Sequence, residues 1–281
     1  MRGLPLALTG LLLATPAALA HPSVSVVLDS EGAVYYSDLK QVWKVARDGT
    51  KSVAVPGVHT HELWMDAQDN LYGEHLWYDG EEKDTWGHRI WRRRANGTIE
   101  TYIPARQGFR DDFDQFHFVR DASGTMYWVD RGTPCLVRKR APGGQAVTIA
   151  QAPFRDVRWM TVTSRGTVYL VDLHDLVRVD PGGAVRTIAR TIADDRRTFG
   201  RLDPHAVMGL WSDAAGNVYA AVYADGVVRK FTPEGAMTEV ARSSTPWGPT
   251  GGAVAPDGSL WILEAHMPDA VRVRRVPPAA R

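Results

Sequence analysis

The stretch from His59 to His75 reads HTHELWMDAQDNLYGEH, and it joins a strand–turn–strand pattern to a dense group of polar side chains. Its centre, residues 66–70 (DAQDN), is a tight turn between two short apolar runs, which is typical of an antiparallel β-hairpin. Three polar residues, His59, His61 and Glu62, precede the first run, and Glu74 ends the second. Because a hairpin brings its two open ends together, these side chains are expected on one side of the molecule.

The same unit recurs along the chain. Each copy has an apolar strand, a turn usually of the form Asp-x-x-Gly, a second apolar strand, a more polar third strand and a Gly-containing hairpin into a fourth. The turns lie at residues 29–32, 66–70, 121–124, 163–166, 213–216 and 255–258. Their spacing of roughly 40 to 55 residues is the blade length of a β-propeller. The sequence therefore predicts an all-β fold, a six-bladed β-propeller of four-stranded antiparallel blades, as one domain over residues 21–281. The last copy has only three strands before Pro277, so its outer edge is left open.

The amino terminus has the pattern of an export signal over residues 1–20. Arg2 supplies the positive start, residues 4–13 an apolar run, and residues 18–20 (ALA) a small-residue cleavage site. The apolar run is shorter than the ~20 residues that span a bilayer. Cleavage would make His21 the first residue of a periplasmic or secreted protein. Cys135 is the only cysteine, so an intramolecular disulfide is excluded.

Charge does not identify a macromolecular partner. The 33 Lys and Arg residues balance 32 Asp and Glu residues, and the two signs are interspersed. Neither a nucleic-acid footprint nor, after signal cleavage, a membrane-binding surface is predicted. The expected partner is a small-molecule substrate or ligand at the mouth of the central channel; the oligomeric state is not predicted.

The nine histidines follow the predicted topology. In a propeller blade, the turns between strands one and two and the hairpins between strands three and four share one face. The starts of strand one and the loops between strands two and three share the other, and all nine histidines map there. Those near the starts of strand one, where blades converge on the channel, are His21, His59, His61, His117 and His205.

These repeats resemble NHL-type repeats, and the whole chain resembles the six-bladed propellers that include gluconolactonase-like and regucalcin-like proteins and the peptidyl-hydroxyglycine amidating lyases. The lyases hold a metal by histidines at the propeller centre. That resemblance implies a divalent transition metal, zinc above all, with ligands His59 or His61, His117 and His205. The gluconolactonase-like proteins use a carboxylate and amide cage for a hard cation. Here Glu62, Asp203 and Glu264 would have to serve without amide partners, which makes a lactonase the weaker interpretation.

Two functions remain open. The first is a metal-dependent lyase or hydrolase acting on a small molecule, with Glu62 or Glu74 as the base and Arg158 holding an anionic group. The alternative is a non-catalytic NHL-type propeller that binds a ligand or a protein. A further hypothesis gives the freed α-amine and imidazole of His21 a role in binding metal or substrate.

Overall fold

The computed structural model describes residues 22–80, 82–108, 116–194, 203, 205–266 and 270–278. The predicted signal and His21 lie outside these residues, so their expected roles stay predictions. The described part of the chain has no helix that is long and apolar enough to cross a membrane.

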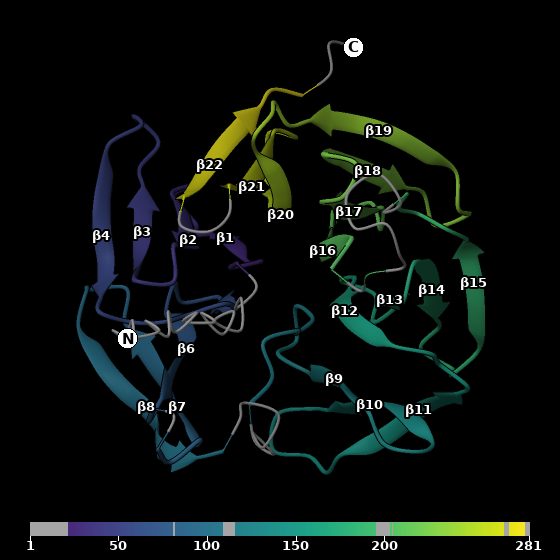
Figure 1. Cartoon of the computed structure of the whole chain (residues 1–281), viewed down its shortest axis with the longest axis horizontal. Helices are drawn as coiled ribbons and strands as arrows, with labels where there is room; N and C mark the ends of the chain where they lie inside the picture. Colours follow the sequence, from purple (N-terminus) through teal and green to yellow (C-terminus); the bar gives the residue numbers. More distant parts are fainter. Residues whose placement is uncertain are drawn as a thin grey trace, which may run out of the picture.

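Six antiparallel sheets stand around a central axis in chain order, each a simple meander (Figure 1). The strands of blades 1 to 3 are β1 (Val26–Leu28), β2 (Val34–Ser37), β3 (Gln41–Val45), β4 (Lys51–Pro56), β5 (Leu63–Met65), β6 (Leu71–Tyr78), β7 (Trp86–Arg93), β8 (Ile99–Gln107), β9 (Met126–Asp130), β10 (Cys135–Arg140) and β11 (Val147–Ala152). Those of blades 4 to 6 are β12 (Val157–Val162), β13 (Val168–Asp172), β14 (Asp175–Val179), β15 (Val185–Ala189), β16 (Val207–Ser212), β17 (Val218–Val222), β18 (Val227–Phe231), β19 (Met237–Arg242), β20 (Gly248–Val254), β21 (Leu260–His266) and β22 (Ala270–Val276). The predicted six-bladed propeller is confirmed.

The core lies between neighbouring blades. A blade is covered on both faces by its neighbours, so its second strand is buried along its whole length, as β13 and β17 are. This burial explains why the second strands are almost continuously apolar, since a strand exposed on one face would alternate apolar and polar residues.

A repeated hydrogen bond braces the turns between strands one and two. In four blades the turn Asp accepts a hydrogen bond from a Tyr hydroxyl six residues later, on the second strand. The pairs are Asp29–Tyr35 at 3.0 Å, Asp66–Tyr72 at 3.1 Å, Asp121–Tyr127 at 3.0 Å and Asp213–Tyr219 at 3.0 Å. Burial, and then the adjacent carboxylate, raise the pKa of Tyr127 and Tyr219 well above the usual value. Strand-two tyrosines therefore hold the turns as well as packing between blades.

Blade 6 closes the ring without a fourth strand. The sheet contains only β20, β21 and β22 among the described residues, and Pro277 and Pro278 follow, which lack the N–H groups that a further ladder needs. The inner strand of blade 6 meets the amino-terminal segment instead. Ser25 forms a parallel bridge with Gly252, and the Thr250 hydroxyl donates to the carbonyl of Ser23 at 2.9 Å. The three strands agree with the last copy of the repeat, in which the sequence has only three strands before Pro277.

Blade 3 also departs from the prediction, because its inner strand is reduced to one bridge between Arg120 and Met126. The segment that should form it, residues 116–120, packs against blade 2 instead. Phe116 is buried and lies 5.8 Å from each of the Tyr72 and Tyr102 rings of that blade. Among the described residues, this aromatic packing takes the place of a regular strand beside β9.

Candidate functional site

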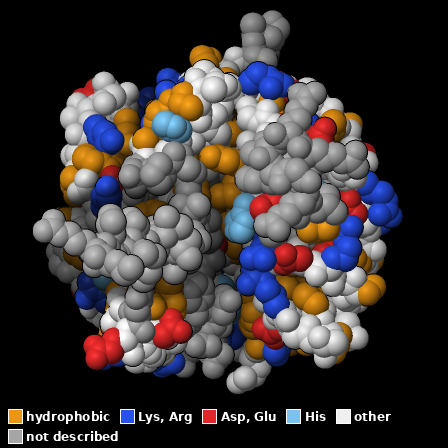
Figure 2. Space-filling view, in the orientation of Figure 1, with side chains coloured by type: hydrophobic (Ala, Val, Ile, Leu, Met, Phe, Trp, Pro, Cys, Tyr) orange, Lys and Arg blue, Asp and Glu red, His pale blue; other side chains and the backbone are white. Residues whose placement is uncertain are grey.

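A central cavity of about 800 Å³ lies where the inner strands converge. Its walls come from β1, β5, β9, β12 and β16 and from the segment 116–120 of blade 3. Figure 2 shows the face of the ring hollowed near its centre, with His side chains and a group of Lys and Arg side chains along the hollow. Because blade 3 has no regular inner strand among the described residues, β9 itself forms part of the wall.

Irregular register occurs near the start of three inner strands. In β12, β16 and β20 the pairing shifts near the start of the inner strand, so that one residue on each is left out of the ladder: Arg158, Met208 and Thr250. Such bulges change the direction in which side chains point, and they are common beside functional sites.

Arg158 lines the cavity, is exposed, and pairs through Nε with both carboxylate oxygens of Asp156, at 2.9 and 3.0 Å. The predicted anion-binding Arg158 therefore has an internal partner.

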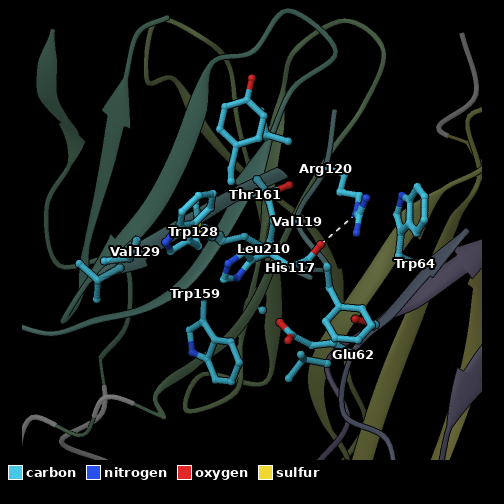
Figure 3. Close-up of a pocket in the computed structure, with 18 of the residues that line it drawn as sticks. Glu62, Trp64, His117, Val119, Arg120, Trp128, Val129, Trp159, Thr161 and Leu210 are labelled. Carbon is cyan, nitrogen blue, oxygen red and sulfur yellow. Dashed lines mark hydrogen bonds between the residues drawn. The ribbon is translucent and has the colours of Figure 1, made fainter. Parts of the chain in front are cut away.

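His117 lies in the cavity wall in a fixed orientation. Its ring stacks on Trp128 with centroids 4.4 Å apart and an angle of 3° between the planes. Trp159 and Glu62 line the same space, and Figure 3 shows the Glu62 carboxylate pointing into the region between His117 and Trp159. The structure therefore brings two of the sequence-predicted residues, His117 and Glu62, to one cavity, with aromatic rings beside them.

Glu74 has a different environment. Its side chain is 0% exposed, and Oε1 accepts the backbone N–H groups of His61 at 2.7 Å and Glu62 at 3.1 Å. Blade 4 repeats the arrangement, since Asp172 accepts the backbone N–H groups of Arg155 and Asp156. These contacts give Glu74 a structural role, in which it fixes the backbone that carries Glu62.

His59 and His61 lie together at the start of blade 2, with ring centroids 4.8 Å apart. Nδ1 of His61 is 3.5 Å from Glu74, and Nδ1 of His75 accepts the backbone N–H of His59 at 3.0 Å. Burial lowers the pKa of His59 and of His75, and for His75 the nearby Arg89 lowers it further. The neutral imidazole is therefore favoured at His59 and His75.

His205 belongs to blade 5. Its Nδ1 lies 2.9 Å from Asp203, which also accepts the His205 backbone N–H at 2.8 Å. Glu264, another sequence candidate, is fully buried in blade 6 and pairs with Arg272 at 2.7 Å and Arg274 at 2.9 Å. Although burial opposes it, the hydrogen bonds from Arg274, Ser243 and Arg272 lower the pKa of Glu264. Both carboxylates already have internal partners.

The predicted metal ligands do not form one group in the described part of the chain. No set of three or more His, Cys, Asp or Glu side chains there is arranged to hold a metal ion. His59 and His61 are paired on blade 2, His117 lies against Trp128, and His205 lies with Asp203. Zinc has no support from these residues. The ligand set stays a prediction.

Sequence reasoning missed Arg120, which also lines the cavity. Its Nε donates to the carbonyl of His117 at 2.9 Å, and its guanidinium lies 4.2 Å from the Trp64 ring and 4.3 Å from the Phe116 ring (Figure 3). The repeat pattern predicts residues 118–120 as the end of the first strand of blade 3, before the turn at 121–124, and gives no sign that Arg120 has a binding role.

Comparisons with known proteins agree on the fold. No protein-family model matches the chain, and no curated protein matches its sequence. Among solved structures, regucalcin from Agrobacterium tumefaciens, described as a calcium-binding protein, is similar with a TM-score of 0.57 and 18% identity over 88% of this chain and 84% of that one. A gluconolactonase from Xanthomonas campestris has a TM-score of 0.55 and 14% identity, over 86% of this chain and 83% of that one. Virginiamycin B lyase from Staphylococcus aureus has a TM-score of 0.50 and 11% identity, over 91% of this chain and 84% of that one. The expected resemblance to gluconolactonase-like and regucalcin-like propellers is thus confirmed at the level of fold.

Proposed function

We propose that this chain is an exported enzyme of the lyase or hydrolase class that binds a small organic molecule in the central cavity. A volume of about 800 Å³ lies within the ~300–1,000 Å³ typical of ligand pockets. The walls combine aromatic rings with a few polar groups that converge from different blades, which is the usual composition of such a site. Similar propellers include a gluconolactonase and a virginiamycin B lyase, which supports these two reaction classes without choosing between them.

His117 and Glu62 are the proposed acid and base. The observation that carries the proposal is their placement on one cavity, with the His117 ring held flat against Trp128. A ring fixed by stacking transfers a proton along a defined direction, and a carboxylate opposite it provides the second proton-transfer group. Hydrolysis requires a base to activate water and an acid to protonate the leaving group. Elimination by a lyase requires a base to remove a proton and an acid to assist departure. Both reactions use the same two groups.

The second candidate is a binding scaffold, and exposed aromatic residues on blade 2 favour it. Tyr78 and Trp86 lie at the end of the long β6–β7 hairpin, are 41% and 36% exposed, and contact each other with ring centroids 5.0 Å apart. Exposed aromatic pairs are common at protein contacts. The hairpin lies outside the cavity lining, so the two functions are separable by mutation.

A substrate screen tests the enzyme proposal. The exported protein is incubated with panels of lactones, esters and elimination substrates, with acid release followed by pH-stat and double-bond formation by absorbance. We expect turnover of at least one class, and we expect Glu62→Gln to reduce it by about a hundredfold or more. Trp86→Ser serves as the matched control and should leave turnover unchanged. Absence of turnover in every panel, or equal turnover by Glu62→Gln, would contradict the proposal.

A further inference from the structure

Arg120 differs from two other arginines that line the cavity, Arg138 and Arg158. Arg138 pairs with Asp130 at 2.9 Å and Arg158 with Asp156. Arg120 has no carboxylate partner among the described residues. Its one hydrogen bond there runs from Nε to the His117 carbonyl, and its terminal nitrogens meet no acceptor within that part of the chain.

The environment of Arg120 is costly for an uncompensated charge. The residue is partly buried, and burial lowers its pKa to about 10, which still leaves it charged at neutral pH. The Trp64 and Phe116 rings hold the guanidinium by cation–π contact, which fixes its plane but satisfies none of its terminal N–H groups. A partly buried guanidinium favours an anionic partner. Its terminal N–H groups are therefore well placed to meet an anion that enters the cavity.

We propose that Arg120 is the anion-binding residue of the central cavity and that the ligand is an organic carboxylate with a flat, apolar body. The guanidinium presents a planar fork of N–H donors, which matches the two oxygens of a carboxylate. The partly exposed rings of Trp64 and Trp128 line the same cavity and supply apolar surface for the rest of the ligand, backed by the buried rings of Phe116 and Trp159. This inference rests on the proposed function, because it specifies the substrate of the same site.

Arg120 also connects the anion to the proposed acid. Its Nε bonds to the backbone carbonyl of His117, three residues earlier, so the anion-binding group and the imidazole are held by one short segment. A carboxylate bound by Arg120 would therefore place the rest of the ligand at a fixed distance from His117. Arg120 is in this sense a binding and orienting residue, and the proton transfer itself stays with His117 and Glu62.

Matched probes test the proposal without knowledge of the natural substrate. Indole-3-acetate and indole-3-acetamide have the same ring and nearly the same shape, but only the first carries a charge. Their affinities for the exported protein are measured by calorimetry and ligand-observed NMR, with inorganic phosphate as a third probe. We expect the acetate to bind at least about tenfold more tightly than the amide, because hydrogen bonds to a charged group contribute more than neutral ones. Phosphate is expected to bind more weakly than the acetate, since it lacks the apolar body.

Variants assign the effect to Arg120. Arg120→Gln should remove the preference for the acetate and leave amide binding unchanged, and Arg120→Lys should retain part of it. Arg92→Gln is the matched control. Like Arg120, Arg92 lies over an aromatic ring, that of Tyr102 at 5.1 Å, but unlike Arg120 it pairs with a carboxylate, that of Glu100. It should keep the full preference. The proposal is overturned if neither probe binds, if acetate and amide bind equally, if phosphate binds as tightly as the acetate, or if Arg120→Gln keeps the preference. Turnover in the substrate screen is scored separately, so a catalytically silent protein that binds carboxylates through Arg120 would refute only the proposed enzyme function.

Discussion

Replacement of Glu74 by Gln separates a structural carboxylate from a catalytic base. In the folded protein the fully buried Glu74 accepts two backbone N–H groups, those of His61 and Glu62. Gln has the same shape, but only one of its two terminal atoms accepts hydrogen bonds, and it carries no charge. The variant therefore weakens the bonds to both N–H groups without creating a cavity.

The expected cost follows from those bonds. Hydrogen bonds to a charged group contribute ~1.5–3 kcal/mol and neutral ones ~1 kcal/mol, so the exchange should cost about 2 kcal/mol. In a domain of this size 1 kcal/mol shifts Tm by ~2–4 °C, so a fall of about 4–8 °C is expected. Glu100→Gln on the same blade is the control. The Glu100 side chain is 31% exposed and pairs with Arg92 and Arg94 at the surface, so Glu100→Gln should lower Tm much less than Glu74→Gln does.

Thermal unfolding followed by circular dichroism measures both variants, and activity is measured on the same preparations. An unchanged Tm for Glu74→Gln would refute the structural role. If the unchanged Tm came with lost turnover, Glu74 would be the base that the sequence suggested. A lowered Tm with turnover largely retained at low temperature would assign the proton transfer to other groups.

Three further changes test other parts of the structure. Gly251→Ala should lower the urea midpoint of unfolding, because a Cβ at this position would overlap the Val24 carbonyl where the ring closes. Such overpacking costs about 1–3 kcal/mol of stability. An unchanged midpoint would mean that the ring closes through other contacts. Burial lowers the pKa of His75, so the unfolded chain binds a proton at this imidazole more tightly than the folded chain does. Tm should therefore fall as the pH drops below about 6.5, and the fall should be smaller in His75→Gln. Identical pH profiles of Tm for the two proteins would argue against a buried neutral imidazole. Tyr219→Phe removes the hydroxyl that donates to Asp213, so the free energy of unfolding from a denaturant titration should fall by about 1 kcal/mol. An unchanged free energy of unfolding would show that this hydrogen bond adds nothing to stability.

The propeller was predictable because its signals are local. A turn such as 66–70 between two apolar runs selects a hairpin through nearby residues alone, and repetition of that unit fixes the ring. Blade 3 could not be predicted in the same way. The residues 116–120 have the alternation of a strand, but Phe116 finds the rings of Tyr72 and Tyr102 on another blade, and that long-range packing prevails over the local pattern.

The candidate site was predictable only in part. The topology placed His117 and Glu62 near the channel, and both line the cavity. The sequence gives no sign that the Glu74 carboxylate accepts two backbone N–H groups, and its role as a base stays a prediction. His205 was grouped with the other histidines although Asp203, two residues earlier, is its partner. Arg120 was missed because an arginine can bind a ligand only where few acceptors of the protein itself surround it, and the tertiary structure decides which acceptors do.

The most direct test of the central claim is the effect of His117→Gln on kcat/KM for the substrate that the screen identifies. If the central cavity is the active site and His117 its acid or base, kcat/KM should fall by about a hundredfold or more, with the fold retained by circular dichroism. His266→Gln is the matched control, because His266 is exposed on blade 6 and lies against Trp247, away from the cavity lining. It should keep full activity. Equal kcat/KM for His117→Gln and the wild-type protein would contradict the account.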